Sequence, residues 1–182
     1  LVPLVDEGKA DNLVPKVTRL RKEISKALGF IVPGVRIRDD LNLEASQYQI
    51  KIGQKIVADD LIYADKKLAI AGDSTNLEVS GLKVKEPAFG VDAYWIDKEL
   101  QADAEAKGYV IVEPDDVLTT HLNQIINSYA SDLLGQEEVQ ELLDNLKVSY
   151  PNLVDTVVPK VMPLNQVTSV MKCILEEGVP IS

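Results

Sequence analysis

The chain has few of the residues on which metal sites and disulfide frameworks depend. Its 182 residues include one cysteine, one histidine and one tryptophan, and 5% of them are aromatic. The single cysteine, Cys173, rules out an internal disulfide. A zinc site built around the single histidine, His121, would need carboxylates for most of its ligands. Cys173 falls in an apolar helical pattern, so we expect it to be a small core residue. The sequence therefore predicts no metal site.

Motifs that bind phosphates or activate nucleophiles are also missing. The sequence contains no Gly-x-Gly-x-x-Gly, no Gly-x-x-x-x-Gly-Lys-Ser/Thr and no Gly-x-Ser-x-Gly. The acidic pairs at 39–40, 59–60 and 115–116 are better explained by turns and helix caps than by catalysis. His121 lies among apolar residues of one helical pattern, which favours a partly buried, hydrogen-bonded structural histidine over a general base. We therefore predict no cofactor and no enzymatic activity, with an enzyme or small-ligand module of similar build as the competing class.

Basic residues and long apolar runs are scarce as well. Asp and Glu outnumber Lys and Arg by 29 to 19, which gives a net charge of −10. Binding to nucleic acid needs concentrated positive charge, so no nucleic acid partner is predicted. No apolar run approaches the roughly 18 residues of a membrane-spanning helix. The sequence begins without Met and stops soon after a helical pattern, so we expect a fragment of a longer protein.

What the chain does have is a change of hydrophobic period along its length. Helical periods are expected at residues 13–28, 97–107, 117–133, 139–146 and 164–175. Strands are expected at residues 35–38, 48–52, 55–57, 67–70 and 109–112, the last of them fully buried, and another around Trp95. A compact βαβ-like unit is expected over residues 91–112. The sequence therefore predicts an α+β fold, with an α/β portion to about residue 133 followed by an all-helical portion.

The only tryptophan and one of the two phenylalanines lie in the segment 86–96. Its Pro-Ala-Phe-Gly turn presents Phe89 from a loop, where a partner can reach the ring. Thr120 lies on the helix that follows the strand at 109–112. An apolar ring rimmed by the Glu86 carboxylate and the Thr120 hydroxyl would suit an amphipathic helix or an extended peptide. The alternative is that Phe89 is a core residue closing the βαβ unit, as most phenylalanines are.

Several segments of the chain share their residues and their order with one known family. These segments are residues 21–24, 28–43, 86–90, 95–96, 117–122, 133–140 and 176–181. Together they extend over nearly the whole chain and make it resemble the type III secretion export-gate family. The sequence of residues 35–43 resembles the flagellar branch of this family more than the virulence-type branch.

The resemblance implies a large protein of the bacterial inner membrane whose C-terminal half lies in the cytoplasm. That half forms a ring of nine copies, docks export chaperones with their cargo, and works with other export components, including the export ATPase complex. It has four subdomains. Here the first would comprise residues 1–64 and 114–133, with an RRM-like second subdomain that binds no RNA inserted at 65–113. The helical third would be cut short within 134–182, and the fourth would be absent.

The resemblance also implies a set of binding residues. In the family, chaperones dock in a dimple between the first two subdomains, formed in part by an acidic residue, a Phe and a Thr. These positions match Glu86, Phe89 and Thr120, and Val112 is expected to line the same dimple. Glu86 stands where the family has Asp. The expected function is a non-enzymatic docking platform, and the alternative is a purely structural ring element without direct chaperone contact.

Overall fold

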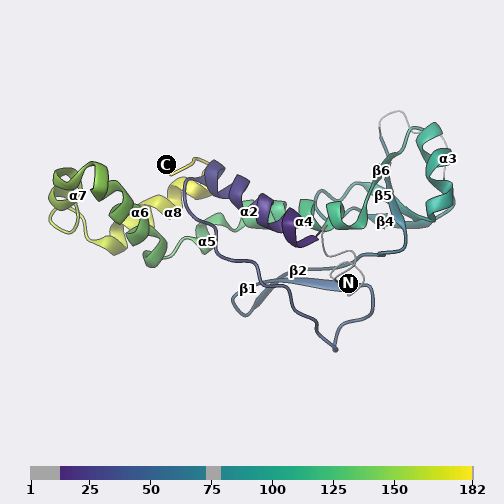
Figure 1. Cartoon of the computed structure of the whole chain (residues 1–182), viewed down its shortest axis with the longest axis horizontal. Helices are drawn as coiled ribbons and strands as arrows, with labels where there is room; N and C mark the ends of the chain where they lie inside the picture. The colour runs from purple at the N-terminus through teal and green to yellow at the C-terminus, as the bar shows by residue number, and fades with distance from the viewer. Residues whose placement is uncertain (1–12, 73–78, 182) are drawn as a thin grey trace. The chain divides into compact units, whose positions relative to one another are not determined.

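The computed structural model describes residues 13–72 and 79–181 of an α+β protein (Figure 1). Over these residues it contains seven α-helices, one short 3-10 helix and two small antiparallel sheets. Contacts divide the chain into two compact units. The first unit comprises Leu1–Thr18 and Arg36–Ile125, and the second comprises Arg19–Val35 and Ile126–Ser182. The α+β class predicted from the sequence is confirmed.

Two antiparallel sheets form the strand-bearing part of the first unit. A hairpin pairs β1 (Gln47–Ile52) with β2 (Lys55–Leu61), and it turns at Gly53, whose φ of 60° suits a residue without a Cβ. The second sheet has the strand order β4-β5-β3-β6. Its members are β3 (Lys67–Ile70), β4 (Leu82–Lys85), β5 (Asp92–Ile96) and β6 (Val110–Val112).

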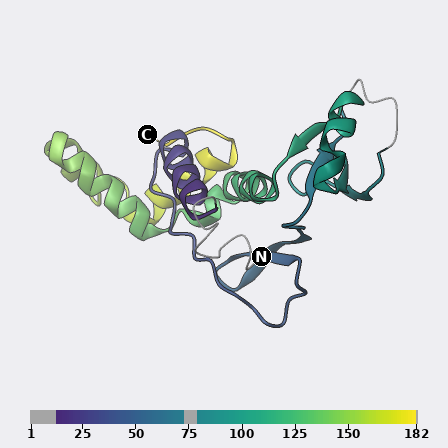
Figure 2. The same cartoon turned by 45° about the vertical axis from the view of Figure 1, so that its right-hand side comes forward.

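Side chains on the two faces of the four-stranded sheet belong to two buried clusters, because successive residues of a strand point to opposite faces. Leu68, Ala93 and Trp95 join Tyr48 of β1 and Val117 of α4 (Pro114–Ser128) in the first cluster. On the other face, residues of α3 (Gln101–Ala106) and of the sheet pack in the second cluster, and α3 lies along this face in Figure 2. The members of the second cluster are Ala69, Val79, Tyr94, Ile96, Ala104 and Tyr109.

The expected βαβ unit over residues 91–112 is present, but another strand lies between its two strands in the sheet. Strand β5 leads through the 3-10 helix η1 (Lys98–Leu100) and α3 into β6. Both β5 and β6 pair antiparallel with β3, so they run parallel to each other with β3 between them. The expectation that residues 109–112 form a fully buried strand is wrong. Strand β6 is an edge strand, and Val110 is 60% exposed.

The strand expected at residues 35–38 is also absent. These residues adopt no regular structure, and Val35 and Ile37 are both exposed. Alternation of apolar and charged residues supplies the pattern of a strand, but a strand also needs a partner for its backbone groups. Neither described sheet includes residues 35–38, so the alternation was misleading.

The second unit is helical. It contains the end of α2 (Leu13–Leu28) together with α5 (Ala130–Leu133), α6 (Gln136–Ser149), α7 (Pro151–Val157) and α8 (Leu164–Glu176). Helix α6 contacts both α7 and α8, and α5 contacts α8. The Glu138 carboxylate accepts the backbone N–H of Gly135 at 2.7 Å and caps α6. These helices confirm the helical character predicted for the end of the chain.

Cys173 was predicted to be a core residue of α8, but its side chain lies on the surface. Val167 and Leu175 are buried on this helix, whereas Cys173 is exposed. The prediction that Cys173 is a core residue is therefore wrong. An apolar period fixes which residues repeat along a helix, but a small residue at the margin of that stripe can fall on either side of it.

Candidate docking site

A tight turn between β4 and β5 carries the exposed aromatic residue. The backbone N–H of Glu86 donates to the carbonyl of Val91, and the N–H of Gly90 donates to the carbonyl of Glu86, both at 2.8 Å. Gly90 adopts a φ of 68°, a left-handed conformation that glycine adopts without the strain of a Cβ. The turn therefore joins two paired strands through defined backbone hydrogen bonds.

The Glu86 side chain stabilises this turn through hydrogen bonds to its backbone. Its carboxylate oxygens accept the backbone N–H of Ala88 at 2.9 Å and that of Phe89 at 2.8 Å. The residue is 3% exposed, so it does not form the open carboxylate rim that the sequence suggested. A buried carboxylate is stable when it accepts hydrogen bonds in this way. Glu86 thus fixes the position of Phe89.

Phe89 itself points away from the core. Its side chain is 72% exposed, so the alternative that it closes the βαβ unit as a core residue is wrong. The neighbouring Val91 is also exposed. A large apolar ring held in water by a hydrogen-bonded turn is a feature that binding surfaces use, because burying it against a partner is favourable.

Val112 and Thr120 occupy different settings. Val112 is half-buried, pairs with Leu68 across the sheet, and packs against the first buried cluster. Thr120 is exposed on α4, whereas the hydroxyl of its neighbour Thr119 bonds back to backbone carbonyls of the same helix. Among the described residues, no hydrogen bond or ring contact joins Phe89 to Thr120. The structure therefore brings Glu86 and Phe89 together directly, whereas Val112 packs against the core of the same unit and Thr120 lies on its surface.

His121 is buried and hydrogen-bonded, as predicted. Its Nδ1 lies 2.6 Å from the Oη of Tyr48. Burial lowers the pKa of His121, and the carboxylates of Asp60 and Glu86 oppose this effect. Burial also raises the pKa of Tyr48, so the phenol stays protonated, and its O–H donates to Nδ1 in the tautomer that carries the ring proton on Nε2. Sequence reasoning missed Tyr48, because no local pattern links β1 to a helix 73 residues further on.

The start of α4 is fixed by an ion-pair cluster. The Nζ of Lys16 lies 2.6 Å from a carboxylate oxygen of Asp115 and also bonds to Asp116. Both carboxylates lie in the first turn of α4, where the helix dipole favours negative charge. The expectation that one of these residues caps the helix is wrong, because α4 already begins at Pro114; both carboxylates pair with Lys16 instead and hold the start of the helix that carries Thr120.

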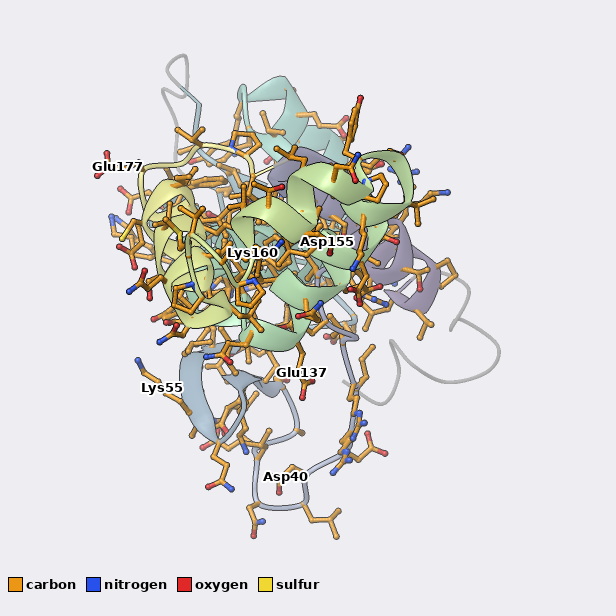
Figure 3. The ribbon with its side chains drawn as sticks, turned by 90° about the vertical axis from the view of Figure 1, so that its left-hand side faces the viewer. Asp40, Lys55, Glu137, Asp155, Lys160 and Glu177 are labelled. Carbon is orange, nitrogen blue, oxygen red and sulfur yellow. The ribbon has the colours of Figure 1, made fainter. Side chains whose placement is uncertain are left out.

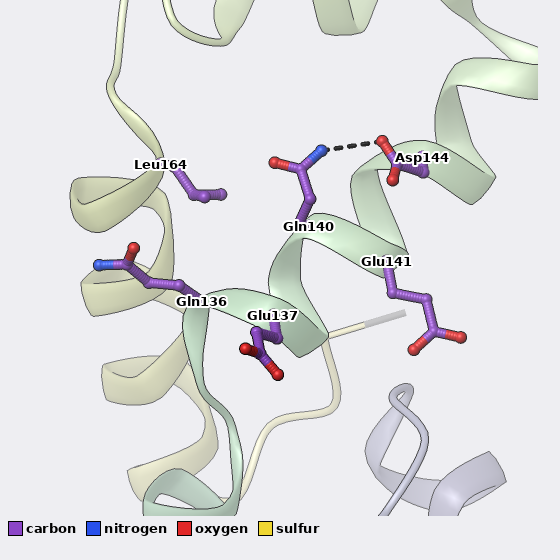
Figure 4. Close-up of a pocket in the computed structure, with 6 residues that line it drawn as sticks. All are labelled: Gln136, Glu137, Gln140, Glu141, Asp144 and Leu164. Carbon is purple, nitrogen blue, oxygen red and sulfur yellow. Dashed lines mark hydrogen bonds between the residues drawn. The ribbon is translucent and has the colours of Figure 1, made fainter.

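An open hollow of about 480 Å³ lies on the second unit (Figure 4). It is lined by Gln136, Glu137, Gln140, Glu141, Asp144 and Leu164, and Gln140 donates to Asp144 at 2.8 Å. Over the described parts of the chain, no group of three or more His, Cys, Asp or Glu residues is arranged to hold a metal ion. The lining of the hollow thus consists mainly of amide and carboxylate side chains, which can form hydrogen bonds.

Charged side chains are spread over both units. Figure 3 labels six that are exposed: Asp40, Lys55, Glu137, Asp155, Lys160 and Glu177. Lys147 and Asp155 form an exposed ion pair at 2.6 Å. Within residues 13–72 and 79–181, no helix has both the length and the apolar character needed to cross a bilayer.

The fold matches that of solved structures. The structure superposes on that of the Chlamydia pneumoniae CdsV protein with a TM-score of 0.80 at 22% identity, covering 93% of this chain and 50% of that one. The nonameric EPEC SctV-C structure gives a TM-score of 0.64 at 19% identity, covering 93% of this chain and 51% of that one. These likenesses show that the chain shares the α+β fold of both structures.

The sequence identifies the family itself. The model of the FHIPEP family matches residues 1–182, and the chain belongs to this family. It is 38% identical over 181 residues to the flagellar biosynthesis protein FlhA of Treponema pallidum and 35% identical to that of Helicobacter pylori. All of this chain aligns in both comparisons, but only 26% and 24% of those relatives. The chain thus spans about a quarter of the length of these curated relatives.

Proposed function

We propose that this chain is a non-enzymatic docking platform of a flagellar type III export gate, which binds export chaperones together with their cargo. The single observation that carries the proposal is the exposed ring of Phe89, held out by a turn that the buried Glu86 carboxylate locks. Membership of the FHIPEP family and similarity to flagellar FlhA proteins support the export-gate setting. The proposal concerns the whole protein's activity, of which this chain is one part.

In this proposal the four predicted residues have different roles. Phe89 provides the apolar contact, and the half-buried Val112 lines the site beside the core. Thr120 offers its exposed hydroxyl to the partner. Glu86 acts from behind, because its carboxylate is engaged by the N–H groups of Ala88 and Phe89. Affinity in the micromolar range, about −8 kcal/mol, would allow binding and release during ordered export.

The remaining parts of the proposal concern location and assembly. We place the full-length protein in the bacterial inner membrane, with this chain on its cytoplasmic side and in a homo-nonameric ring. A nonameric ring is the state named for the EPEC SctV-C structure, and a complex with CdsO is named for Chlamydia pneumoniae CdsV. These cases support ring assembly and contacts with other proteins, and we extend the proposal to other export components, including the ATPase complex.

We also propose the subdomain division implied by the resemblance. In this division residues 65–113 form an RRM-like subdomain inserted into a first subdomain made of residues 1–64 and 114–133. The strand order β4-β5-β3-β6 supports the insertion, since the split βαβ connection and the all-antiparallel pairing are those of a ferredoxin-like sheet. The connection from β3 to β4 passes through residues 73–78, which lie outside the described part of the chain.

A purely structural ring element is the second candidate. It is favoured by exposed apolar residues on the second unit, where Val148 and Val161 are 85% and 74% exposed. Such residues suit contact between copies of a chain. In that case Phe89 would have no part in chaperone binding, and its substitution would alter self-association or stability instead.

Titration calorimetry separates the two candidates. The chain is titrated with a purified filament-type export chaperone–cargo complex, and the Phe89→Ala, Thr120→Ala and Leu41→Ala variants follow. Leu41 is the matched control, because it is fully exposed and belongs to the same unit. The proposal predicts at least a tenfold loss for Phe89→Ala, a smaller loss for Thr120→Ala and no change for Leu41→Ala. Equal affinity of folded Phe89→Ala and the unsubstituted chain would overturn it.

A further inference from the structure

A buried tyrosine–histidine pair lies in the same unit as the proposed docking site and has no role in it so far. The hydroxyl of Tyr48 and the Nδ1 of His121 are 2.6 Å apart, and the two rings meet edge to face with centroids 5.8 Å apart. Tyr48 is 2% exposed and His121 is 6% exposed. The bond ties β1 to α4 across a long stretch of sequence, so it constrains how the hairpin and the helix pack.

The pair fixes the rotation of α4 beside Thr120. Successive residues of an α-helix are rotated by about 100° around its axis. Because His121 points into the core and is bonded to Tyr48, the preceding Thr120 is turned toward the surface, where it is exposed. Val117, one turn earlier, is buried in the same cluster as Tyr48. The hydrogen bond therefore helps to set which face of α4 a partner meets.

The same pair is linked to the turn that holds Phe89. Asp60 lies directly opposite Tyr48 in the β1–β2 register. The carboxylates of Asp60 and Glu86 act on the pKa of both Tyr48 and His121, and Asp59 acts on that of Tyr48. Glu86 is also the acceptor for the N–H groups of Ala88 and Phe89. Glu86 therefore holds the turn through hydrogen bonds and acts on the pair through its charge.

We propose that Tyr48 and His121 are positioning residues of the docking site, whose hydrogen bond holds α4 and the turn of residues 86–91 in the arrangement that receives a partner. The inference rests on the proposed function and adds that protonation of His121 regulates docking. A proton on His121 would create a buried cation within the electrostatic influence of the Asp60 and Glu86 carboxylates. That cation would draw the Glu86 carboxylate away from the turn, so protonation weakens docking.

Three substitutions and one control test the hydrogen bond. Tyr48→Phe keeps the ring and removes the hydroxyl, and His121→Leu removes the acceptor. His121→Asn is the conservative variant, since its side-chain oxygen can accept in place of Nδ1. Tyr94→Phe is the matched control: Tyr94 is also buried in the four-stranded sheet, but it belongs to the cluster on the other face. Each variant is titrated with the same chaperone–cargo complex at pH 7.5, after its folded fraction is confirmed by urea unfolding.

The expected results are specific to position. Loss of one neutral hydrogen bond predicts an affinity about fivefold weaker for Tyr48→Phe. His121→Leu should weaken binding at least as much, His121→Asn should restore most of the affinity, and Tyr94→Phe should leave it unchanged. A purely structural role would lower the unfolding midpoint of Tyr48→Phe without changing the affinity of the folded chain, and that result would overturn the inference.

The pH profile provides a second readout. We expect the affinity of the unsubstituted chain to fall as the pH is lowered from 7.5 to 5.5, and the ratio of its affinity to that of His121→Asn to fall with it. Taking this ratio cancels any titration of the partner. A constant ratio would overturn the inference while leaving the docking function intact. If the unsubstituted chain fails to bind at pH 7.5, both the inference and the proposed function are overturned.

Discussion

The two units of this chain are built on different kinds of interaction. In the first unit, contacts between residues far apart in the sequence, such as Tyr48 with His121 and Lys16 with Asp115, position α4, whereas local hydrogen bonds to Glu86 hold the turn that carries Phe89. In the second unit, the polar contacts are mostly local, such as Glu138 with Gly135 and Gln140 with Asp144. The first unit therefore combines a hydrogen-bonded turn with long-range contacts that position α4, and we assign docking to this unit.

The exposed apolar residues differ in the same way. Phe89 is held by a turn in which both the backbone and the buried Glu86 carboxylate are hydrogen-bonded. Val148 is exposed at the end of α6, and Val161 is exposed beyond α7. Among the described residues, no buried side chain is hydrogen-bonded to the backbone beside either valine in the way that Glu86 is beside Phe89. A preorganised ring loses less conformational entropy on binding. The comparison therefore predicts that substitutions in the first unit affect binding and stability more than those at exposed sites of the second.

The largest effect should come from the core of the four-stranded sheet. Leu68 is fully buried between Trp95 and Val112 of the neighbouring strands, so Leu68→Ala should lower the unfolding free energy of the first unit by about 2–5 kcal/mol. Trp95 is the only tryptophan, and its fluorescence reports this unit alone. Leu41→Ala, at a fully exposed position of the same unit, is the control and should change the urea midpoint little. Equal midpoints for both variants would contradict the assignment of the core.

The next effect concerns the turn. Glu86→Gln keeps the shape of the side chain but replaces a charged acceptor of two N–H groups with an amide, so we expect stability to fall by about 1.5–3 kcal/mol. Glu86→Asp introduces the residue that the family resemblance leads us to expect at this position. This variant should retain more of the stability than Glu86→Gln. Thermal unfolding followed by tryptophan fluorescence measures both. A Glu86→Gln variant as stable as the unsubstituted chain would mean that the carboxylate does not hold the turn.

The third prediction is a pH dependence of stability. Because burial lowers the pKa of His121 in the folded state, the unfolded state binds the proton more readily. The stabilisation is therefore present above the unfolded pKa of about 6.5 and is lost as the pH falls through that value toward the lower folded pKa. Urea unfolding at pH 7.5, 6.5 and 5.5 should show this loss. The difference in unfolding free energy between the unsubstituted chain and His121→Asn should shrink with falling pH, and a constant difference would contradict the account.

The smallest effect should come from the second unit's cysteine. Cys173 is exposed on α8, so Cys173→Ser should change the unfolding free energy by less than about 0.5 kcal/mol. The thiol of the folded chain should also react quickly with a maleimide reagent. Slow labelling of the native chain, together with fast labelling in urea, would show that the thiol is protected.

Regular elements were predicted well where a periodic pattern and a clear end signal coincide. The helix expected at 13–28 is α2 with the same bounds, and Gly29, with a φ of 86°, ends it. The hairpin of β1 and β2 also follows its alternation and its glycine. Strand β4 was missed, because four residues with two lysines give too short a pattern to distinguish from a loop.

The candidate site was predictable only in part. The position of Phe89 between a proline and a glycine indicated a loop, and the exposed ring agrees with it. The burial of Glu86 was not predictable, since it depends on two backbone N–H groups that only the turn brings together. The Tyr48–His121 bond and the unpaired segment 35–38 depend on which elements meet in three dimensions, and a single sequence carries no signal for that.

The most direct test of the docking site uses the two phenylalanines of the chain. Phe30, which lies in the second unit and is 2% exposed, is an internal control for the exposed Phe89. With both residues replaced by 4-fluorophenylalanine, fluorine NMR should show two signals, assigned with Phe89→Leu. Titration with an export chaperone–cargo complex should shift or broaden the Phe89 signal more than the Phe30 signal. Binding that leaves the Phe89 signal unchanged would contradict a docking site on this turn.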